Sequence, residues 1–480
     1  MTLRYPKGLF IGGKWTSSHG GVTAIENPST GDTIGELQLA SEQDVDHAVE
    51  AARAALRGPW GKLSAAERGR FLSSISAIVT KHADWLAELE ASDVGKPISQ
   101  ARADVRALAR YFEFYGGAAD KIHGETIPYQ AGYTVYTLLE PFGVTGHIIP
   151  WNYPMQIIGR SVVAALTMGN AAVLKPAEQA SLTSLAVAEL LHEAGLPPGV
   201  LNVVPGTGPV AGEALAGHRG IDHVSFTGST GVGATVQAAA SRNAVPVTLE
   251  LGGKSPQVVF DDADIESALP FLLNAGIQNA GQTCSAGSRI IVQRGVYEEV
   301  VDRLGRKFND LKAGPAMDDH ALGPLISNKQ QEVVARYLEQ GERELKLVGR
   351  GSIVEDAPAG GHYVPPSLFA DVSGDHRLAQ EEVFGPLVVV IPFDSEDDAI
   401  ELANGTPYGL VAGAWTKDGG RQMRLARSLR AGQVFLNNYG AAGGVELPFG
   451  GVGRSGHGRE KGMEALYSFS TLKTVAAYHG

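Results

Sequence analysis

Residues 144–175 read VTGHIIPWNYPMQIIGRSVVAALTMGNAAVLK: a strand-like segment, a turn with two prolines, a helical stretch and a second strand-like segment. Val144–Ile149 and Ala171–Leu174 fit buried strands, and the segment between them fits a helix. The same pattern continues with strands predicted at Val200–Val204 and Asp222–Phe226, each followed by helix. Such alternation predicts an α/β fold with a doubly wound parallel sheet, whose ligands bind beyond the carboxyl ends of the strands.

Further elements lie on both sides of this region. A helix is expected to begin after Ser64, with Glu67 completing a capping box, and to run to a stop at Gly95. We interpret the helices before residue 121 as packing surfaces that carry no chemistry. Strands and helices from Gln257 to about Phe435 predict a second α/β unit.

Composition excludes several classes of protein. A chain of 480 residues exceeds one ordinary core, so two or three packed units are expected. The net charge of −12 without a basic cluster argues against nucleic-acid binding. A single cysteine and thirteen scattered histidines predict no disulfide framework and no metal site. Neither a signal peptide nor an apolar run of roughly 18 residues is found, which predicts a cytoplasmic protein without membrane contact.

The single cysteine, Cys284, lies in the stretch QNAGQTCSAGSR over residues 278–289. Small residues and glycines around it allow backbone to approach a ligand closely, which suits a nucleophile. A free cysteine is also often a small buried hydrophobe. Position alone leaves both interpretations open.

Two segments at predicted strand ends suit nucleotide binding. Gly228–Gly233 follows a strand and opens a helix, so its N–H groups could face a pyrophosphate, although the glycine spacing is not G-x-G-x-x-G. Lys175 and Glu178 follow a neighbouring strand, where a carboxylate could accept hydrogen bonds from ribose hydroxyls and repel a 2′-phosphate. A structural turn and a surface ion pair are the alternatives.

Seven motifs in order make the sequence resemble the aldehyde dehydrogenase superfamily over nearly its whole length. The motifs are Pro150–Pro154, Lys175–Glu178, Phe226–Ser229, Leu249–Lys254, Gly281–Cys284, Glu382–Pro386 and Pro448–Gly451. The resemblance implies an NAD-dependent, non-acylating enzyme that oxidises a small-molecule aldehyde to the carboxylic acid. Glu178 favours NAD over NADP.

The resemblance implies a role for three catalytic residues. Cys284 would attack the aldehyde to form a thiohemiacetal and then a thioester. The Asn152 amide and the Cys284 N–H would stabilise the oxyanion, and Glu250 would activate the hydrolytic water. A paired core carboxylate and a turn residue are the alternatives for Glu250 and Asn152.

The resemblance also implies the residues around the cofactor and the substrate. The cofactor set is Ile148, Pro150, Trp151, Asn152, Lys175, Ala177, Glu178, Gly208, Phe226, Thr227, Gly228, Ser229, Val232, Glu250, Leu251, Gly252, Glu382 and Phe384. The substrate set is Tyr153, Arg160, Gln278, Thr283, Ser285 and Tyr439.

Arg160 lies eight residues after Asn152, about two helical turns on, close to the same face. Many relatives have an aromatic residue there, whereas succinic semialdehyde dehydrogenases have an arginine that holds the substrate's carboxylate. Ser161 follows it here, where most relatives have lysine, so the match is partial. The alternatives are a carboxylate-bearing semialdehyde bound by Arg160, or an Arg160 paired within the protein and a neutral aliphatic or aromatic aldehyde.

Three rival functions remain: a dehydrogenase that acylates coenzyme A, a non-catalytic nucleotide-binding protein, and a thiol hydrolase. Glu250 argues against the first, since that group generally lacks it. The implied architecture has three parts: an NAD-binding domain (1–121 and 142–253), a catalytic domain (254–452), and oligomerisation strands (122–141 and 466–480). A homodimer or homotetramer is therefore expected, in which this strand element extends a partner's sheet.

Overall fold

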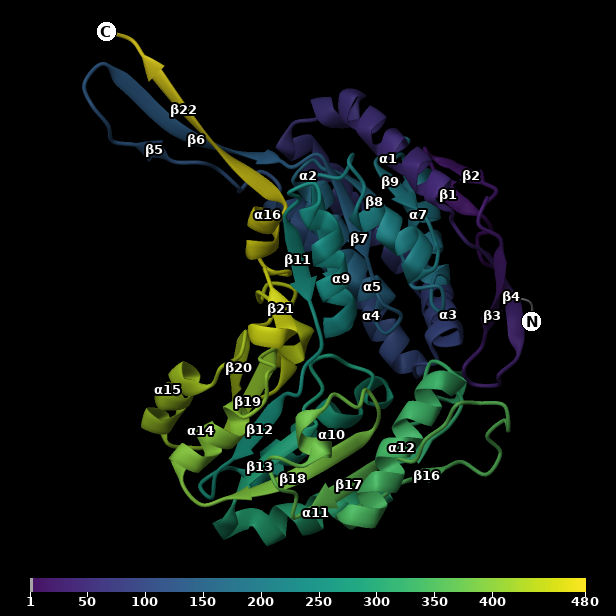
Figure 1. Ribbon diagram of the computed structural model, residues 1–480, viewed down its shortest axis with the longest axis vertical. Coiled ribbons are helices and arrows are strands. Elements are labelled where there is room, and N and C mark those ends of the chain that lie inside the picture. Colours follow the sequence, from purple (N-terminus) through teal and green to yellow (C-terminus); the bar gives the residue numbers. More distant parts are fainter. Residues whose placement is uncertain (1–2) are drawn as a thin grey trace.

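The computed structural model describes residues 3–480, in which two large sheets lie one beyond the other and a narrow antiparallel arm projects from the body (Figure 1). No helix among these residues is both long and apolar enough to cross a bilayer.

The first sheet has eight strands, and the five at its centre are parallel. In sheet order the strands are β2 (Lys14–Thr16), β1 (Leu9–Ile11), β9 (Leu201–Val203), β8 (Ala171–Lys175), β7 (Val144–Ile148), β10 (His223–Thr227), β11 (Val247–Glu250) and β21 (Gly456–His457). Every residue of β7, β8 and β10 is buried, the polar Thr145, His147 and Ser225 included, as expected for parallel strands covered on both faces. All four predicted strands are present, each with one or both bounds off by one residue, because β7 ends at Ile148, β8 at Lys175, β9 spans Leu201–Val203 and β10 spans His223–Thr227.

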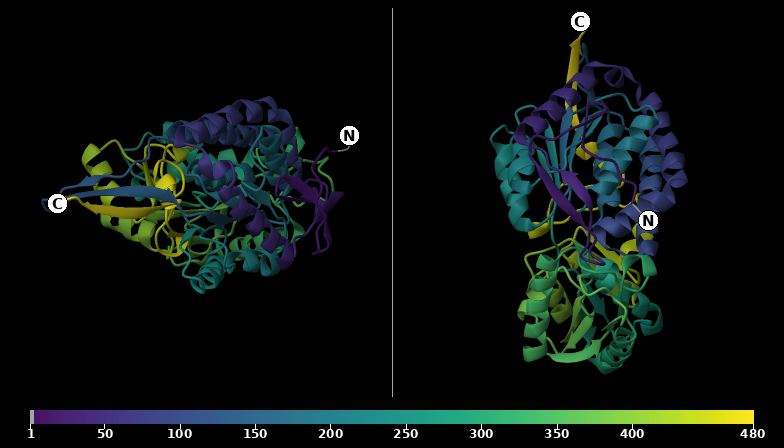
Figure 2. Two further views of the ribbon diagram at one scale, coloured as in Figure 1. Left: turned by 90° about the horizontal axis from the view of Figure 1, so that it is seen from above. Right: turned by 90° about the vertical axis from the view of Figure 1, so that its right-hand side faces the viewer.

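Helices cover both faces of this sheet, which confirms the doubly wound arrangement (Figure 2). One face carries α1 (Glu42–Arg57), α8 (Glu213–Ala216) and α9 (Thr230–Ser241). The other carries α2 (Ala65–Lys81), α3 (Ala83–Val94), α4 (Ile98–Ala118), α5 (Pro154–Ile157), α6 (Ala164–Thr167) and α7 (Leu182–Glu193).

The single helix expected from Ser64 to Gly95 is wrong. The capping box of Ser64 and Glu67 begins α2, but α2 ends at Lys81 and α3 begins at Ala83. His82 between them has φ −103° and ψ 19°, which is not helical. This break lets Val79 and Leu86 both enter the core, so tertiary packing outweighs the continuous local periodicity.

The second sheet has seven strands, parallel except at β15, so the predicted second α/β unit is confirmed. In order they are β15 (Lys346–Arg350), β17 (Ser367–Ala370), β18 (Leu387–Phe393), β13 (Arg289–Gln293), β12 (Pro256–Val259), β19 (Val411–Trp415) and β20 (Gln433–Leu436). Its helices are α10 (Ile265–Ile277), α11 (Tyr297–Asn309), α12 (Asn328–Glu344), α13 (Arg377–Gln380), α14 (Glu396–Asn404) and α15 (Gly419–Ser428).

The arm consists of three antiparallel strands from distant parts of the chain (Figure 1). They are β5 (Thr126–Ile127), β6 (Tyr133–Pro141) and β22 (Ser470–Tyr478), with α16 (Glu464–Ser468) before β22. Two short two-stranded sheets complete the fold: β3 (Val22–Glu26) with β4 (Thr33–Gln38), and β14 (Lys312–Ala313) with β16 (Ser352–Ile353). Leu472 and Tyr478 on β22 are 63% and 71% exposed, which leaves apolar surface on the arm.

Candidate active site

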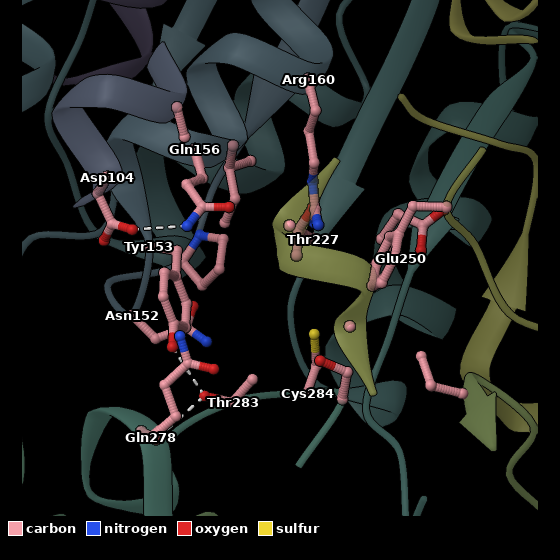
Figure 3. A pocket seen from close by; sticks show the side chains of 18 of the residues that line it. Asp104, Asn152, Tyr153, Gln156, Arg160, Thr227, Glu250, Gln278, Thr283 and Cys284 are labelled. Atoms are coloured by element: carbon pink, nitrogen blue, oxygen red, sulfur yellow. Dashed lines mark hydrogen bonds between the residues drawn. The ribbon is translucent and has the colours of Figure 1, made fainter. Parts of the chain in front are cut away.

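A cavity of about 610 Å³ collects residues from the ends of strands in both sheets, together with α4, the α5 segment and the loop after β20. All six predicted substrate residues line it: Tyr153, Arg160, Gln278, Thr283, Ser285 and Tyr439. The three predicted catalytic residues, Asn152, Glu250 and Cys284, line it as well. In Figure 3 the Cys284 sulfur points into this space, with Asn152 and Thr283 on one side and Glu250 on the other.

The loop that carries Cys284 has an unusual backbone. Asn279, Ala280 and Gly281 have φ of 50°, 54° and 74°, three left-handed residues in succession. A Cβ at Gly281 would lie 2.2 Å from the Gly385 carbonyl oxygen, so no larger residue fits there. Strain of this kind persists only where the surroundings enforce it, and it is common at functional sites.

Hydrogen bonds hold the loop in place. The Gln282 amide donates to the Asn279 carbonyl at 3.1 Å and accepts from the Ile326 N–H at 2.9 Å. The Tyr439 hydroxyl donates to the Ser285 carbonyl at 2.7 Å. Cys284 therefore lies in the cavity lining on a fixed backbone; it packs against the cluster that contains Val411 and Phe435 and remains partly exposed.

Asn152 follows β7 and is 4% exposed. Its Nδ2 donates to the Gln282 carbonyl at 3.0 Å, and its backbone carbonyl accepts from the Asn279 side-chain amide at 3.1 Å. The first bond uses one Nδ2 hydrogen and fixes the amide plane. The second hydrogen is left for an acceptor in the cavity, as an oxyanion donor requires.

Glu250 is the last residue of β11 and is 2% exposed. Within residues 3–480 neither of its carboxylate oxygens has a hydrogen-bond partner. Burial raises the pKa of Glu250 well above its ordinary value; Glu460 raises it further and Arg160 lowers it. A carboxylate with a raised pKa is a better proton acceptor near neutral pH than an ordinary glutamate. Burial likewise raises the pKa of the Cys284 thiol to about 11, an effect that Arg160 partly offsets.

Arg160 has an acidic partner within the protein. Its Nε lies 2.5 Å from Glu460 Oε2, and the two side chains are 8% and 0% exposed. Its Nη2 donates to Thr227 Oγ1 at 3.2 Å, and its guanidinium lies 4.9 Å from the ring centre of Phe449. These contacts supply the ion pair that is expected if Arg160 is paired within the protein. Its role as a ligand for a substrate carboxylate stays a prediction.

One end of the cavity presents predicted cofactor residues. The rings of Trp151 and Phe384 meet edge to face, with centroids 5.4 Å apart. Glu382 Oε1 accepts from the Gly253 N–H at 3.0 Å, and a Cβ at Gly252 would lie 2.1 Å from Glu382 Oε2. Ten predicted cofactor residues line the cavity: Pro150, Trp151, Asn152, Thr227, Gly228, Ser229, Glu250, Gly252, Glu382 and Phe384.

Other predicted cofactor residues lie away from the cavity. Lys175 Nζ lies 3.6 Å from Glu178 Oε2 at the end of β8, and Val232 is exposed in the first turn of α9. Ser229 caps α9 by accepting from the Val232 N–H, so free N–H groups at this helix start could meet an anion. A Cβ atom added at Gly208 would have no described atom of another segment within 4 Å, so the space beside this residue is open. These features fit the adenosine and pyrophosphate of a dinucleotide. Ala177 is buried beside Glu178, and Ile148, Phe226 and Leu251 are buried in the core below, so a ligand could meet them mainly through backbone.

Several cavity residues lie outside the predicted catalytic, cofactor and substrate sets. They are Gln100, Ala103, Asp104, Ala107, Gln156, Ile157, Asn274, Gln330, Val411, Gln433, Phe435, Gly440, Ala442, Gly443, Gly444, Leu447, Phe449 and Lys461. The expectation that the early helices only pack is therefore wrong for α4, which brings Gln100 and Asp104 to the cavity wall. Gln156 could have been found, because it lies on the short helix that begins two residues after Asn152. Burial lowers the pKa of Lys461 to about 8.

Comparison with known proteins identifies the family. The pattern of the aldehyde dehydrogenase family matches residues 15–475. A Burkholderia cenocepacia structure assigned as an aldehyde dehydrogenase is 60% identical, with a TM-score of 0.98 over 98% of this chain and all of that one. An NAD+ complex of a Bacillus cereus aldehyde dehydrogenase is 42% identical, with a TM-score of 0.96 over all of this chain and 98% of that one. The Saccharomyces cerevisiae aldehyde dehydrogenase [NAD(P)+] 2 is 42% identical over 99% of this chain and 96% of its own length. The resemblance and the fold class are thus confirmed, and the chain belongs to the aldehyde dehydrogenase family.

Proposed function

We propose that this enzyme oxidises an aldehyde to the carboxylic acid with NAD+, through covalent intermediates on Cys284. The observation that carries the proposal is the meeting of Cys284, Asn152 and Glu250 in one cavity whose far end presents Trp151 and Phe384. When bound, NAD+ supplies the acceptor for the hydride that leaves the substrate carbon.

The chemistry assigned to Cys284 begins with proton removal. Because the pKa of its thiol is raised to about 11, the thiol needs a base, and Glu250, with its raised pKa, suits that task. The thiolate adds to the carbonyl carbon and forms a C–S bond, while the carbonyl oxygen becomes an oxyanion. The second Nδ2 hydrogen of Asn152 and the Cys284 N–H would stabilise that charge.

Glu250 is assigned the hydrolytic step. After hydride loss the sulfur carries a thioester, and Glu250 accepts a proton from a water molecule that attacks the acyl carbon. The C–S bond then breaks, the acid leaves, and Cys284 is regenerated. This assignment favours hydrolysis over transfer of the acyl group to coenzyme A.

The same proposal assigns NAD binding to residues 1–121 and 142–253 and the nucleophile to residues 254–452. Glu178 would accept hydrogen bonds from the adenosine ribose and repel a 2′-phosphate, which favours NAD over NADP. The exposed arm, from 122–141 and 466–480, would be covered by another subunit in a homodimer or homotetramer. Since Arg160 already forms an ion pair with Glu460, we propose a neutral aldehyde rather than a carboxylate-bearing one as the substrate.

The test is NADH formation at 340 nm with a panel of aldehydes, using wild type and Cys284→Ala. The proposal expects NADH with wild type and at least about a thousandfold loss in the variant, because the nucleophile is gone. Absence of NADH with every aldehyde would overturn the proposal. Ester hydrolysis that is indifferent to NAD, without any aldehyde oxidation, would point instead to a thiol hydrolase.

A further inference from the structure

One wall of the cavity holds an amide whose orientation is fixed. Gln156 lies on α5, four residues after Asn152 in the sequence, and its Nε2 donates to Asp104 Oδ1 at 2.5 Å. A carboxylate accepts and cannot donate, so Gln156 must turn its NH₂ toward Asp104. Its carbonyl oxygen, Oε1, then points away from Asp104 and into the cavity, as Figure 3 shows. The wall therefore presents a hydrogen-bond acceptor.

Asp104 is itself held by a buried cation. Lys96 donates to Asp104 Oδ2 and, at 2.6 Å, to Glu90 Oε1; the three side chains are at most 4% exposed. The Lys96 ammonium also lies 4.0 Å from the ring centre of Tyr153. Because one Asp104 oxygen accepts from Lys96 and the other from Gln156, rotation of the Asp104 carboxylate would break both hydrogen bonds. The acceptor at Oε1 is preorganised rather than adaptable.

Another part of the cavity lining is aromatic and aliphatic, with the Arg160 guanidinium and the Lys461 ammonium over its Phe449 ring. Phe435 and Phe449 are buried in one cluster with Leu410 and Val411, and Tyr439 packs against it. Except for Leu410 these residues line the cavity, together with Leu447. Because the Tyr439 hydroxyl donates its hydrogen bond to the Ser285 carbonyl, Tyr439 contributes mainly its ring to the cavity lining. A ligand in the cavity therefore has both hydrocarbon and aromatic surface and a fixed acceptor available to it.

We propose that Gln156, oriented by Asp104, accepts a hydrogen bond from a hydroxyl group on the substrate, so that hydroxyl-bearing aldehydes are the preferred substrates. The inference rests on the proposed function and specifies the substrate class of that same cavity. A hydroxyl donor satisfies Oε1, whereas a methoxy group or a carboxylate would place an acceptor against an acceptor. Asp104 is the positioning residue, since it acts through Gln156.

The test uses aldehyde pairs that differ only in the donor hydrogen: 3-hydroxy- and 3-methoxybenzaldehyde, 4-hydroxy- and 4-methoxybenzaldehyde, and glycolaldehyde and methoxyacetaldehyde. NADH formation gives kcat/KM for each at a pH where the phenols are neutral. In at least one pair we expect kcat/KM to be about tenfold higher for the hydroxyl-bearing aldehyde, which corresponds to the contribution of one hydrogen bond. Gln156→Met, which keeps the length of the side chain but not its acceptor, should remove the preference.

A second variant separates positioning from simple packing. In Asp104→Asn, Lys96 can still donate to the side-chain oxygen at position 104, which leaves the new NH₂ to donate to Gln156 Oε1. The Gln156 amide then turns its NH₂ to the cavity, and the preference should reverse toward the methoxy partner. A merely structural role would lower kcat/KM equally for both partners. Gln433→Met is the matched control: it alters another cavity glutamine, whose amide donates to the Pro448 carbonyl at 2.7 Å, and should leave the preference unchanged.

The outcomes distinguish this inference from the proposed function. NADH formation with equal kcat/KM within every pair, or a preference that survives Gln156→Met, overturns the inference and leaves the proposed function standing. Absence of NADH with every aldehyde overturns the proposed function and this inference with it. If Asp104→Asn does not fold, as measured by thermal unfolding, Gln156→Met still decides, because it removes the acceptor itself and leaves the pair of Asp104 and Lys96 in place.

Discussion

The buried pair of Arg160 and Glu460 leads to a prediction in which two substitutions shift one pH profile in opposite directions. Both residues act on Glu250, since Glu460 raises its pKa and Arg160 lowers it, beyond the larger rise caused by burial. Arg160→Met removes the cation, so the pKa of Glu250 should rise. Acid formation limited by thioester hydrolysis should then reach half its maximum at higher pH. Glu460→Gln removes the neighbouring negative charge and should shift the same midpoint to lower pH. We expect about one pH unit each way, the size typical of a nearby charge.

The same pair sets the expected cost in stability. Because the two side chains are 8% and 0% exposed, either single substitution leaves a buried charge without its partner. Such a loss costs about 3–5 kcal/mol of folding free energy, whereas removing both charges costs much less. Urea unfolding followed by tryptophan fluorescence should therefore show Arg160→Met with Glu460→Leu to be more stable than either single variant. Midpoints that move in the same direction for both folded single variants would refute the electrostatic argument.

Three further predictions address other parts of the enzyme. Glu250→Gln should unfold at a higher temperature than wild type, and the difference should grow as pH rises above 4.5. Because the pKa of Glu250 is raised in the folded protein, the folding stability of wild type falls by about 1.4 kcal/mol per pH unit up to that pKa, whereas glutamine does not titrate. An equal difference in unfolding temperature at pH 5 and pH 8 would contradict this sign. Glu178→Ser should raise KM for NAD and lower KM for NADP, measured by coenzyme titration, and an unchanged ratio would remove Glu178 from ribose recognition. Leu472→Asp, at a site 63% exposed on β22, should reduce the mass measured by light scattering, whereas a mass identical to wild type would show that this arm does not join subunits.

Most of the fold could be predicted because its strands carry a strong signal. β7, β8 and β10 are buried throughout, and each is a short segment next to turn residues that alternates with helical segments along the chain. The break at His82 could not be predicted, since the apolar spacing continues across it and only packing separates α2 from α3.

The candidate site divides in the same way. Asn152 and Glu250 lie in motifs at the ends of strands, and Cys284 lies in a glycine-flanked loop before β13, so the residue types alone suggest chemistry. Contacts between distant segments leave no such signal. Arg160 meets Glu460, which is 300 positions away, and Gln156 meets Asp104 on a helix that reads only as a packing surface.

The most direct test of the central claim is to trap the covalent intermediate. Glu250→Gln mixed with one aldehyde and NAD+ should release a burst of one NADH per subunit and then stall, because the thioester is not hydrolysed. Intact and peptide mass spectrometry should then find the acyl group on the peptide that contains Cys284, and none in the double variant with Cys284→Ala. A burst without an acyl group on Cys284, or full turnover by Glu250→Gln, would contradict the account.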